Sequence, residues 1–391
     1  MQKRREDQTR ISGYNRPDGS AGIRNHTVVL SSVHCSAEVT RKIANLTGAI
    51  PITHLLGCLE YPKDSQHTRE MLVGILSNPN VAAGLIVGLG CEQIQPEELA
   101  EKVPGKSFES LHIQDSGVVK TISEGVKIVR QLMQQATTIK REEIPISKLI
   151  LGVKCGGSDA TSGMVSNPAL GVAADLLVKE GGAVILGETE GLFGAEQILA
   201  NRAVSQKIGN QLITLMKRYE QNANSRGVSL TDANPTPGNI AGGITTLREK
   251  ALGSVLKGGT STLQGLLERA ETPPREGLWI MKTSKGVDVF HVSDEIAGGA
   301  QIICFTTGRG TPLGSPISPV IKITANRETA ENMSESIDVD ISTVIRGEET
   351  VQEAGERIFK EILEVANGKL TKNEILHHRE FAISPFTNLT N

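Results

Sequence analysis

Short apolar segments that end in glycine and a reactive side chain recur along this chain, and they constrain its fold more than any other feature. The clearest is residues 149–159, LILGVKCGGSD, where an apolar run is followed by Lys154, Cys155, two glycines, Ser158 and Asp159. A run that is apolar on both faces is typical of a buried parallel strand. Because ligands of α/β folds bind at the carboxyl ends of such strands, we expect a functional site beside Cys155.

Apolar segments of this kind alternate with amphipathic segments over most of the chain. Predicted strands cover residues 27–31, 50–56, 83–88 and 108–113, and predicted helices follow them. This alternation is the pattern of a mostly parallel sheet covered by helices. Right-handed crossovers bring the strand carboxyl ends to one edge. We therefore expect an α/β fold of two Rossmann-like domains with mostly parallel sheets, and a site at the strand carboxyl ends between the domains.

The length of the chain, 391 residues, exceeds what one ordinary hydrophobic core supports. We expect residues 1–25 to form an N-terminal tail and loop, residues 26–140 a first α/β domain, and residues 141–391 a second α/β domain. The second domain contains long loops rich in proline and glycine, such as 232–243. Long loops of this composition often carry function.

Charge and cysteine usage narrow the class of protein. The 41 basic and 44 acidic residues nearly balance, which argues against a nucleic-acid partner. No apolar run approaches the roughly 20 residues that a membrane helix needs, so we expect no membrane association. The first ten residues are polar, unlike a secretory signal. Five cysteines without disulfide-scaffold spacing favour a cytoplasmic protein.

Three cysteines follow predicted strands and have glycine neighbours: Cys58, Cys91 and Cys155. Three thiols from three strand ends could ligate iron, as one Fe²⁺ ion or as an iron–sulfur cluster. The alternative is that they pack as small hydrophobic side chains, which is the favoured interpretation for Cys35 and Cys304. No CxxC spacing decides between these possibilities.

Carboxylates also gather at predicted strand ends, at Glu92, Asp159, Glu188 and Glu190. Carboxylates in such positions can bind a metal through oxygen or transfer protons. Capping of a helix start is the alternative for Asp159, which lies three residues before Ser162.

One histidine and one glycine-rich loop complete the candidate site. His54 lies four residues before Cys58, and it is either a proton-transfer group or a satisfied core histidine. The loop at Thr306, Thr307 and Arg309 (TTGRGT) could hold a carboxylate or sulfonate through the guanidinium and backbone N–H groups, unless it is a surface turn. No Gly-x-Gly-x-x-Gly follows the first predicted strand, so we expect neither a nicotinamide nor a flavin cofactor.

Several motifs in order along the chain resemble the altronate/galactarate dehydratase family. They run from GYNRPDG near the N-terminus through HLLGC, GLGCE, CGGSD, SNPALG, ETE and PGN to FTTGRG. The resemblance covers about residues 13–370. It implies an iron-dependent lyase that removes the proton on C2 of a 2-hydroxy acid, expels a group from C3 and yields a 2-oxo acid.

Two departures from the fused dehydratases bear on partner and substrate. Such enzymes begin with a small domain of roughly a hundred residues that has no counterpart here, which implies that a small subunit supplies it and that the enzyme is an oligomer. Residues 281–284 (MKTS) and 310–316 (GTPLGSP) are similar to the large subunit of the family's two-subunit sulfo-lyases. The expected reaction is therefore sulfite release from (2R)-3-sulfolactate to give pyruvate, or alternatively dehydration of a sugar acid such as altronate or galactarate.

The resemblance suggests individual roles as hypotheses. The metal-side groups would be Cys58, Cys91 and Cys155, and the catalytic groups would be His54, Glu92 and Asp159. The small hydroxy-acid substrate would be held by Arg309, Thr306, Thr307, Lys154, Lys282 and Arg24. Two other classes remain open: a non-catalytic scaffold subunit, and a nucleotide-binding oxidoreductase, which the missing glycine fingerprint disfavours.

Overall fold

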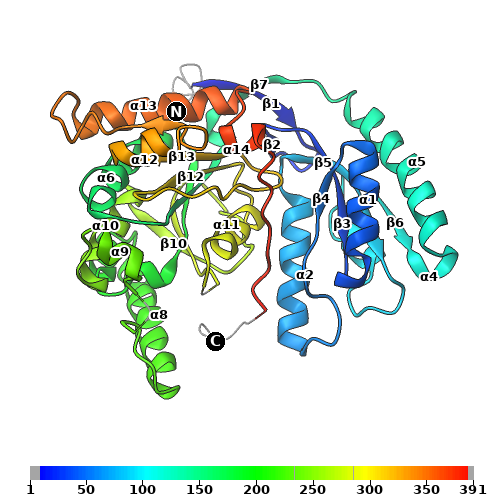
Figure 1. Ribbon diagram of the computed structural model, residues 1–391, viewed down its shortest axis with the longest axis horizontal. Helices are drawn as coiled ribbons and strands as arrows, with labels where there is room; N and C mark the ends of the chain where they lie inside the picture. The colour runs from blue at the N-terminus through cyan, green and yellow to red at the C-terminus, as the bar shows by residue number, and fades with distance from the viewer. Residues whose placement is uncertain (1–8, 233, 285, 386–391) are drawn as a thin grey trace.

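The computed structural model describes residues 9–232, 234–284 and 286–385. It shows two α/β lobes side by side, with the N-terminal lobe in blue and cyan and the C-terminal lobe in green to orange (Figure 1). The predicted α/β class with mostly parallel sheets is confirmed. Of the expected N-terminal tail, residues 1–8 lie outside the described residues. None of the helices in the described ranges is long and apolar enough to cross a membrane.

The first domain is a four-stranded parallel sheet in the order β4-β3-β5-β6. Helices α1 and α5 pack on one face, and α2 and α3 on the other. Proline at the first position of α2 and of α3 suits helix starts. The elements are β3 (His26–Ser31), α1 (Ala37–Thr47), β4 (Ile50–Ile52), α2 (Pro62–Ser77), β5 (Val81–Gly88), α3 (Pro96–Glu101), β6 (Ser107–His112), α4 (Ile113–Ser116) and α5 (Val118–Ala136).

The second domain is a seven-stranded sheet in the order β10-β11-β9-β8-β12-β13-β14, parallel throughout. Its strands are β8 (Ile150–Cys155), β9 (Ala183–Leu186), β10 (Leu263–Leu267), β11 (Gly277–Met281), β12 (Ile302–Thr306), β13 (Val320–Thr324) and β14 (Val339–Asp340). Because the central strands are apolar on both faces, they need helices on both sides.

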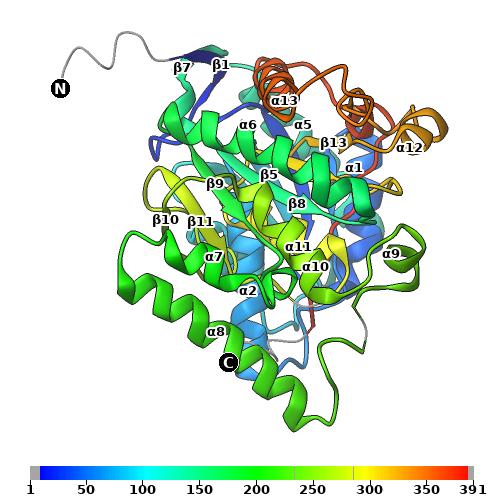
Figure 2. The same ribbon diagram turned by 90° about the vertical axis from the view of Figure 1, so that its left-hand side faces the viewer.

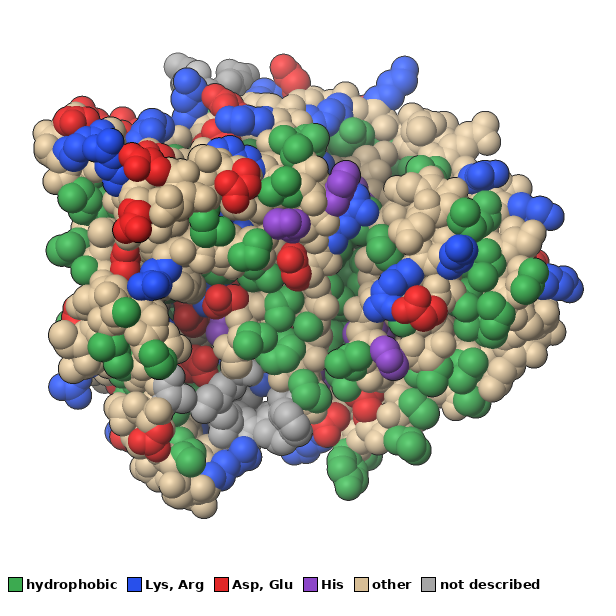
Figure 3. Space-filling model, in the orientation of Figure 1, with side chains coloured by type: hydrophobic (Ala, Val, Ile, Leu, Met, Phe, Trp, Pro, Cys, Tyr) green, Lys and Arg blue, Asp and Glu red, His purple; other side chains and the backbone are tan. Residues whose placement is uncertain are grey.

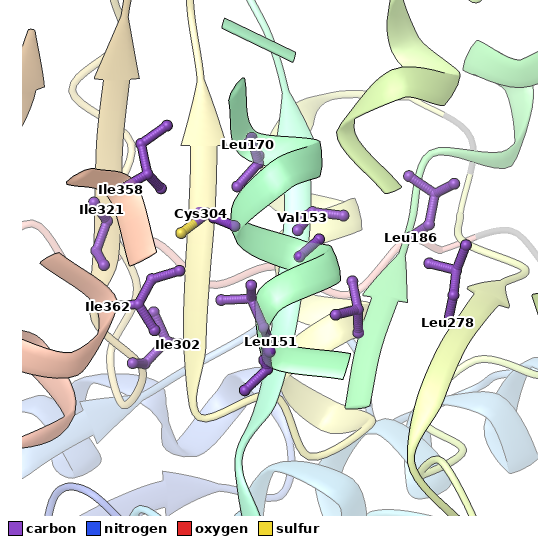
Figure 4. Packing of buried hydrophobic residues seen from close by; sticks show 14 of the residues in the cluster. Leu151, Val153, Leu170, Leu186, Leu278, Ile302, Cys304, Ile321, Ile358 and Ile362 are labelled. Atoms are coloured by element: carbon purple, nitrogen blue, oxygen red, sulfur yellow. The ribbon is translucent and has the colours of Figure 1, made fainter. Parts of the chain in front are cut away.

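Helices α6 (Asn167–Lys179) and α13 (Val351–Ala366) pack together on one face of this sheet, and α11 (Asp288–Ala297) contacts β8 from the other. Figure 4 shows the core beneath α6, where Leu151, Val153 and Cys304 from neighbouring strands meet apolar helix residues. Cys304 is fully buried in this core, as favoured from the sequence, and burial raises the pKa of its thiol. Cys35, for which the same packing was favoured, is exposed instead.

The remaining helices lie around the second domain: α7 (Glu196–Asn201), α8 (Gln206–Ser225), α9 (Pro237–Ala241), α10 (Leu247–Val255), α12 (Arg327–Asn332) and α14 (Lys372–Ile375). Figure 2 shows the long helix α8 running obliquely across this side of the molecule. A 3₁₀ turn, η6 (Leu256–Gly258), directly follows α10. This turn positions a residue of the candidate site.

The expectation of a tail and loop for residues 1–25 is wrong for part of this segment. Strand β1 (Arg10–Asn15) pairs antiparallel with β2 (Ala21–Gly22) and with β7 (Glu142–Pro145). Ile11 is buried in the core of the second domain. The short alternation of buried and exposed residues in β1 gives it one packed face, which explains why it forms a strand.

The two domains meet through α2 and α11, whose C-terminal ends lie side by side. The side-chain amide of Asn78, just after α2, donates to the carbonyl oxygens of Ile296 at 2.9 Å and Ala300 at 3.0 Å, near the end of α11. Helices in such folds run opposite to the strands they cover, so the carboxyl edges of the two sheets lie at the same end of the molecule. The edges are separate, because α2 and α11 lie between the sheets.

Candidate active site

The strand order of the second domain reverses between β8 and β12, which is where α/β sheets open a crevice for ligands. The loops after these strands are joined by backbone hydrogen bonds. Gly156 N–H donates to Thr306 O at 3.1 Å, and the N–H groups of Gly308 and Arg309 donate to Gly157 O at 3.2 and 2.9 Å. Gly157 has φ +57°, a left-handed conformation that favours glycine.

Buried ionisable side chains lie behind this crevice, and we call them the lysine cluster: Lys154, Cys155, Glu188, Ser254 and Lys257. Both lysines are fully buried. Oε2 of Glu188 lies 3.0 Å from Nζ of Lys154 and 3.3 Å from Nζ of Lys257. Lys257 also donates to the Ser254 hydroxyl at 2.5 Å and to Cys155 Sγ at 3.3 Å. Two cations therefore share one carboxylate at the strand edge.

Electrostatics within the cluster are set by this pairing. Burial alone would raise the pKa of Glu188, but the ammonium groups of Lys154 and Lys257 outweigh burial and hold this pKa well below its usual range. Burial alone would lower the pKa of Lys154, but Glu188 and Asp288, whose Oδ1 is 3.0 Å away, raise it above its usual value. Lys154 and Glu188 are thus both charged near neutral pH.

Glu188 adopts a left-handed backbone conformation, φ 63° and ψ 54°, which is uncommon for a residue other than glycine. Such conformations persist where the surroundings hold them, and they gather at functional sites. The Thr283 hydroxyl accepts a hydrogen bond from the backbone N–H of Glu188 at 3.0 Å. The strained turn aims the carboxylate at the two lysines.

A cavity of about 260 Å³ opens in front of the cluster, with Cys155 in its wall. Its polar lining includes Ser158, Asp159 and Lys250, and its apolar lining includes Met164 and Leu252. The Ser158 hydroxyl is buried and has no hydrogen-bond partner among the described residues. On the face of the molecule drawn in Figure 3, acidic side chains lie recessed in a hollow to the lower left. The cavity has room for a small molecule.

Asp159 lines the cavity but is held by its neighbours. Its Oδ1 accepts from the hydroxyl of Thr161 at 2.7 Å and from the N–H of Ser162 at 3.0 Å, and its Oδ2 accepts from Asn326 at 2.8 Å. A Cβ added at Gly308 would come within 2.1 Å of the Asp159 carboxyl carbon. The bonds to Thr161 and Ser162 favour the capping alternative, and Asp159 stays a catalytic prediction only.

The side chains of the predicted anion-binding loop differ in whether the chain itself already binds them. The Thr306 hydroxyl donates to Asn167 Oδ1 at 2.6 Å, and Thr307 Oγ1 accepts from the N–H of Gly310 at 2.9 Å, so both hydroxyls shape the loop. Arg309 is exposed, and no ion pair is found for it within the described ranges. Arg309 is therefore available to bind an anion on the loop after β12.

Lys282 lies apart from the cavity. It forms an ion pair with Glu268 and lines a separate groove of about 1390 Å³, between α2 and the β10 end of the second domain. The structure therefore does not bring Lys282 to the lysine cluster.

The carboxyl edge of the first sheet holds His54 and Glu92, and both are engaged by the chain itself. His54 Nε2 lies 2.8 Å from Ser31 O, and its Nδ1 accepts from the N–H of Leu56 at 3.2 Å. Burial lowers the pKa of His54 to about 4, so the ring is neutral. This geometry favours the satisfied core histidine, and a proton-transfer role for His54 stays a prediction only.

Glu92 closes the turn after β5. Its carboxylate accepts from the Ser32 hydroxyl at 2.9 Å and from the N–H groups of Leu89 and Gly90 at 3.0 and 2.6 Å. Burial acts to raise the pKa of Glu92, but these hydrogen bonds outweigh it and lower the pKa. A carboxylate held this way is a weak base, so the hydrogen bonds disfavour the catalytic role of Glu92, which stays a prediction only.

The three predicted iron ligands do not converge. Cys58 and Cys91 are exposed at the edge of the first sheet, whereas Cys155 is buried in the second domain. Within residues 9–232, 234–284 and 286–385, no three His, Cys, Asp or Glu side chains are placed to hold a metal ion. The ammonium group of Lys257 also occupies the space beside Cys155 that a cation would need. These residues do not fit the iron site that the resemblance implies.

Arg24 has a structural role that contradicts substrate binding. Its guanidinium pairs with Glu374 at 2.7 Å and donates to the carbonyl oxygens of Val365 at 3.0 Å and Lys369 at 2.8 Å. The side chain thereby ties the N-terminal segment to the end of α13, far along the chain.

Replacing this arginine should cost stability and leave the site intact. Arg24→Ala leaves the partly buried Glu374 and two carbonyl oxygens without their donor, so we expect a loss of about 2–4 kcal/mol in the free energy of unfolding. Urea unfolding measures it, with the exposed Arg327→Ala as control. A turnover loss in folded Arg24→Ala protein would contradict this role.

The sequence interpretation missed Lys257, Ser254 and Asp288. Ser254 lies near the end of α10, Lys257 lies in the turn η6, and Asp288 is the first residue of α11. None lies at a strand end, which was the signal used. One signal was available: a lysine in an otherwise small and apolar segment, GSVLKGG, is unusual unless it is paired.

Family models match the chain in two blocks. The model described as D-galactarate/altronate dehydratase, C-terminal, matches residues 146–388. The chain belongs to the D-galactarate/altronate dehydratase family. A second model, for the second domain of D-galactarate dehydratase/altronate hydrolase, matches residues 13–137 of this family member. The resemblance seen in the sequence motifs is confirmed.

Curated relatives of this dehydratase-family chain are lyases by name. It is 37% identical over 375 residues to (2R)-sulfolactate sulfo-lyase subunit beta of Chromohalobacter salexigens, covering 95% of this chain and 96% of that protein. It is 33% identical over 389 residues to altronate dehydratase of Bacillus subtilis (95% and 77%), and 35% identical over 383 residues to galactarate dehydratase (L-threo-forming) of Escherichia coli (92% and 73%). The prediction of a lyase is confirmed.

Proposed function

We propose that this chain is the large subunit of a lyase that releases sulfite from (2R)-3-sulfolactate and yields pyruvate. The similarity to a sulfo-lyase subunit over nearly the full length of both chains supports this substrate. Dehydration of a sugar acid is the second candidate, supported by the altronate and galactarate dehydratases among the relatives.

The observation that carries an elimination site is the lysine cluster behind the cavity. Lys154 and Lys257 are both fully buried and share the single carboxylate of Glu188. Removal of the C2 proton next to a carboxylate creates an enolate with additional negative charge. Preorganised cations in a dry site stabilise such charge far better than water does.

The side chains have defined roles in the proposed reaction. The C2 proton passes to a general base outside the lysine cluster, and the ammonium groups of Lys154 and Lys257, paired with Glu188 at 3.0 and 3.3 Å, stabilise the enolate. Arg309, exposed on the loop after β12, holds the distal anion. The C3–S bond breaks, its electron pair leaves with sulfite, and the enol becomes the ketone of pyruvate when C3 takes up a proton.

Cofactor, partner and location complete the proposal. Iron stays a prediction of the family resemblance, and no step is assigned to it because the described side chains do not form its site. A small subunit is the proposed partner, since the sulfo-lyase relative is named as a subunit. A reducing cytoplasm is supported by five free cysteines.

A substrate panel tests this function. The chain is co-purified with its small subunit under anaerobic, iron-replete conditions and offered (2R)-3-sulfolactate, altronate and galactarate. We expect sulfite and pyruvate in equal amounts from sulfolactate. A 2-oxo acid from a sugar acid without sulfite would favour the dehydratase, and no 2-oxo acid from any of the three would support a scaffold.

A further inference from the structure

One buried acid beneath the site has no role in the proposed reaction. Glu295, on α11, is completely buried. Neither of its carboxyl oxygens has a hydrogen-bond partner among the described residues. An unpartnered buried polar group costs free energy, and native structures rarely keep one without a reason.

Two glycines of the central strands make room for this carboxyl group. A Cβ at Gly152 would lie 2.4 Å from Glu295 Oε2, and a Cβ at Gly187 would lie 2.1 Å from Oε1. Gly152 is two residues before Lys154 on the same face of β8, and Gly187 immediately precedes Glu188. The carboxyl group therefore lies directly beneath the lysine cluster.

The inner face of α11 points this acid at the cluster. Asp288, His291 and Glu295 follow one another at spacings of three and four residues, which places them on one helix face. The charged groups that act on Glu295 are Lys154 from β8, Glu188 after β9, Lys257 from η6 and Asp294 on its own helix. On helix α2, which packs on α11, Gly74 faces the backbone of Ala297.

We propose that Glu295 is a positioning residue that sets how much positive charge the cluster offers to the substrate anion. While it is protonated, the charge of Lys154 and Lys257 is compensated by Glu188 and Asp288. Once it is ionised, a further negative charge lies beneath them and weakens anion binding. This role rests on the proposed function, because it assumes that the cavity binds an anion.

The protonation of Glu295 gives this role a defined pH range. Burial raises the pKa of Glu295 to about 8, although Lys154 and Lys257 act to lower it. The folded protein thus holds a proton that the unfolded chain releases above about pH 4.3. The contribution of Glu295 to the free energy of unfolding therefore falls as pH rises from about 4.3 to about 8, and it is constant above that pH.

The test compares Glu295→Gln with the parent complex at pH 7 and pH 9. We measure KM for (2R)-3-sulfolactate and, independently of turnover, the Kd of inorganic sulfate as an anion probe. In the parent complex, KM and the sulfate Kd should each rise about tenfold from pH 7 to pH 9, which is the effect of one added charge several ångströms away. In Glu295→Gln both should change less than twofold, and Glu328→Gln, which removes an exposed charge, should follow the parent.

Unfolding distinguishes this role from a structural one. Glu295→Gln should be as stable as the parent at pH 5 and more stable at pH 8, and Glu295→Met provides the same comparison if the Gln variant misfolds. A Gln variant whose KM and sulfate Kd follow the parent, or that is less stable at every pH, would overturn the proposal. A complex that turns over no hydroxy acid yet shows the expected sulfate pattern would refute the proposed function alone.

Discussion

Lys257→Met should reduce kcat by about 10²- to 10³-fold, the range expected when one preorganised group that stabilises a developing anion is removed. Methionine fills the buried space of the lysine stem, but it carries no positive charge that could stabilise the enolate. Glu188 keeps Lys154 as a partner at 3.0 Å, so the fold should survive. The measurement is steady-state release of pyruvate and sulfite by the purified two-subunit complex.

Lys217→Met is the matched control for this change. Lys217 is an exposed lysine on α8, outside the cavity, so its replacement should leave kcat within twofold. The thermal midpoint and the elution volume of Lys257→Met must match those of the parent before kinetics are compared. A correctly folded Lys257→Met complex with parental kcat would show that Lys257 does not stabilise the enolate.

Glu188→Gln should lower the free energy of unfolding by about 3–5 kcal/mol at pH 7, because breaking a buried ion pair leaves an uncompensated charge. Here two buried ammonium groups lose the carboxylate they share. The control is Glu268→Gln, which breaks the more exposed pair with Lys282 and should cost about 0–1 kcal/mol. Urea unfolding measures both changes.

The pH dependence of this loss follows from the pKa of Glu188, which is lower in the folded protein than in the unfolded chain. Its stabilising contribution is complete above the unfolded pKa of about 4.3 and is lost as pH falls through the folded pKa. The stability difference between parent and Glu188→Gln should therefore be constant from pH 5 to 7 and shrink below about pH 4. A difference that grows with acidification would contradict the assigned pairing.

The sequence predicted the site residues that lie at the end of a strand, but not the residue that only tertiary packing brings to the site. Lys154 and Cys155 were found because they end a two-sided apolar run, and such runs end at the ligand edge of a parallel sheet. Lys257 follows Cys155 by about a hundred residues, and only the packing of η6 against β8 brings the two together. No local pattern encodes that contact.

The same limit explains the predictions that the structure corrects or disfavours. The sequence correctly placed His54 and Glu92 near strand ends, but it does not show that backbone groups of Ser31 and Gly90 satisfy them. The predicted thiol site assumed that both sheet edges share one cavity. The edges lie at the same end of the molecule, but α2 and α11 separate them. Arg24 was separated from its partners by more than 340 residues.

The central claim is that the reaction takes place in the cavity beside Cys155 and Lys257. A crystal structure of the Lys257→Met complex soaked with (2R)-3-sulfolactate tests it most directly, because this variant should bind the acid without consuming it. We predict ligand density in the 260 Å³ cavity, with one anionic group near Lys154 and the other toward Arg309. Density at the His54 and Glu92 edge, or in the groove beside Lys282, with the cavity empty, would contradict the account.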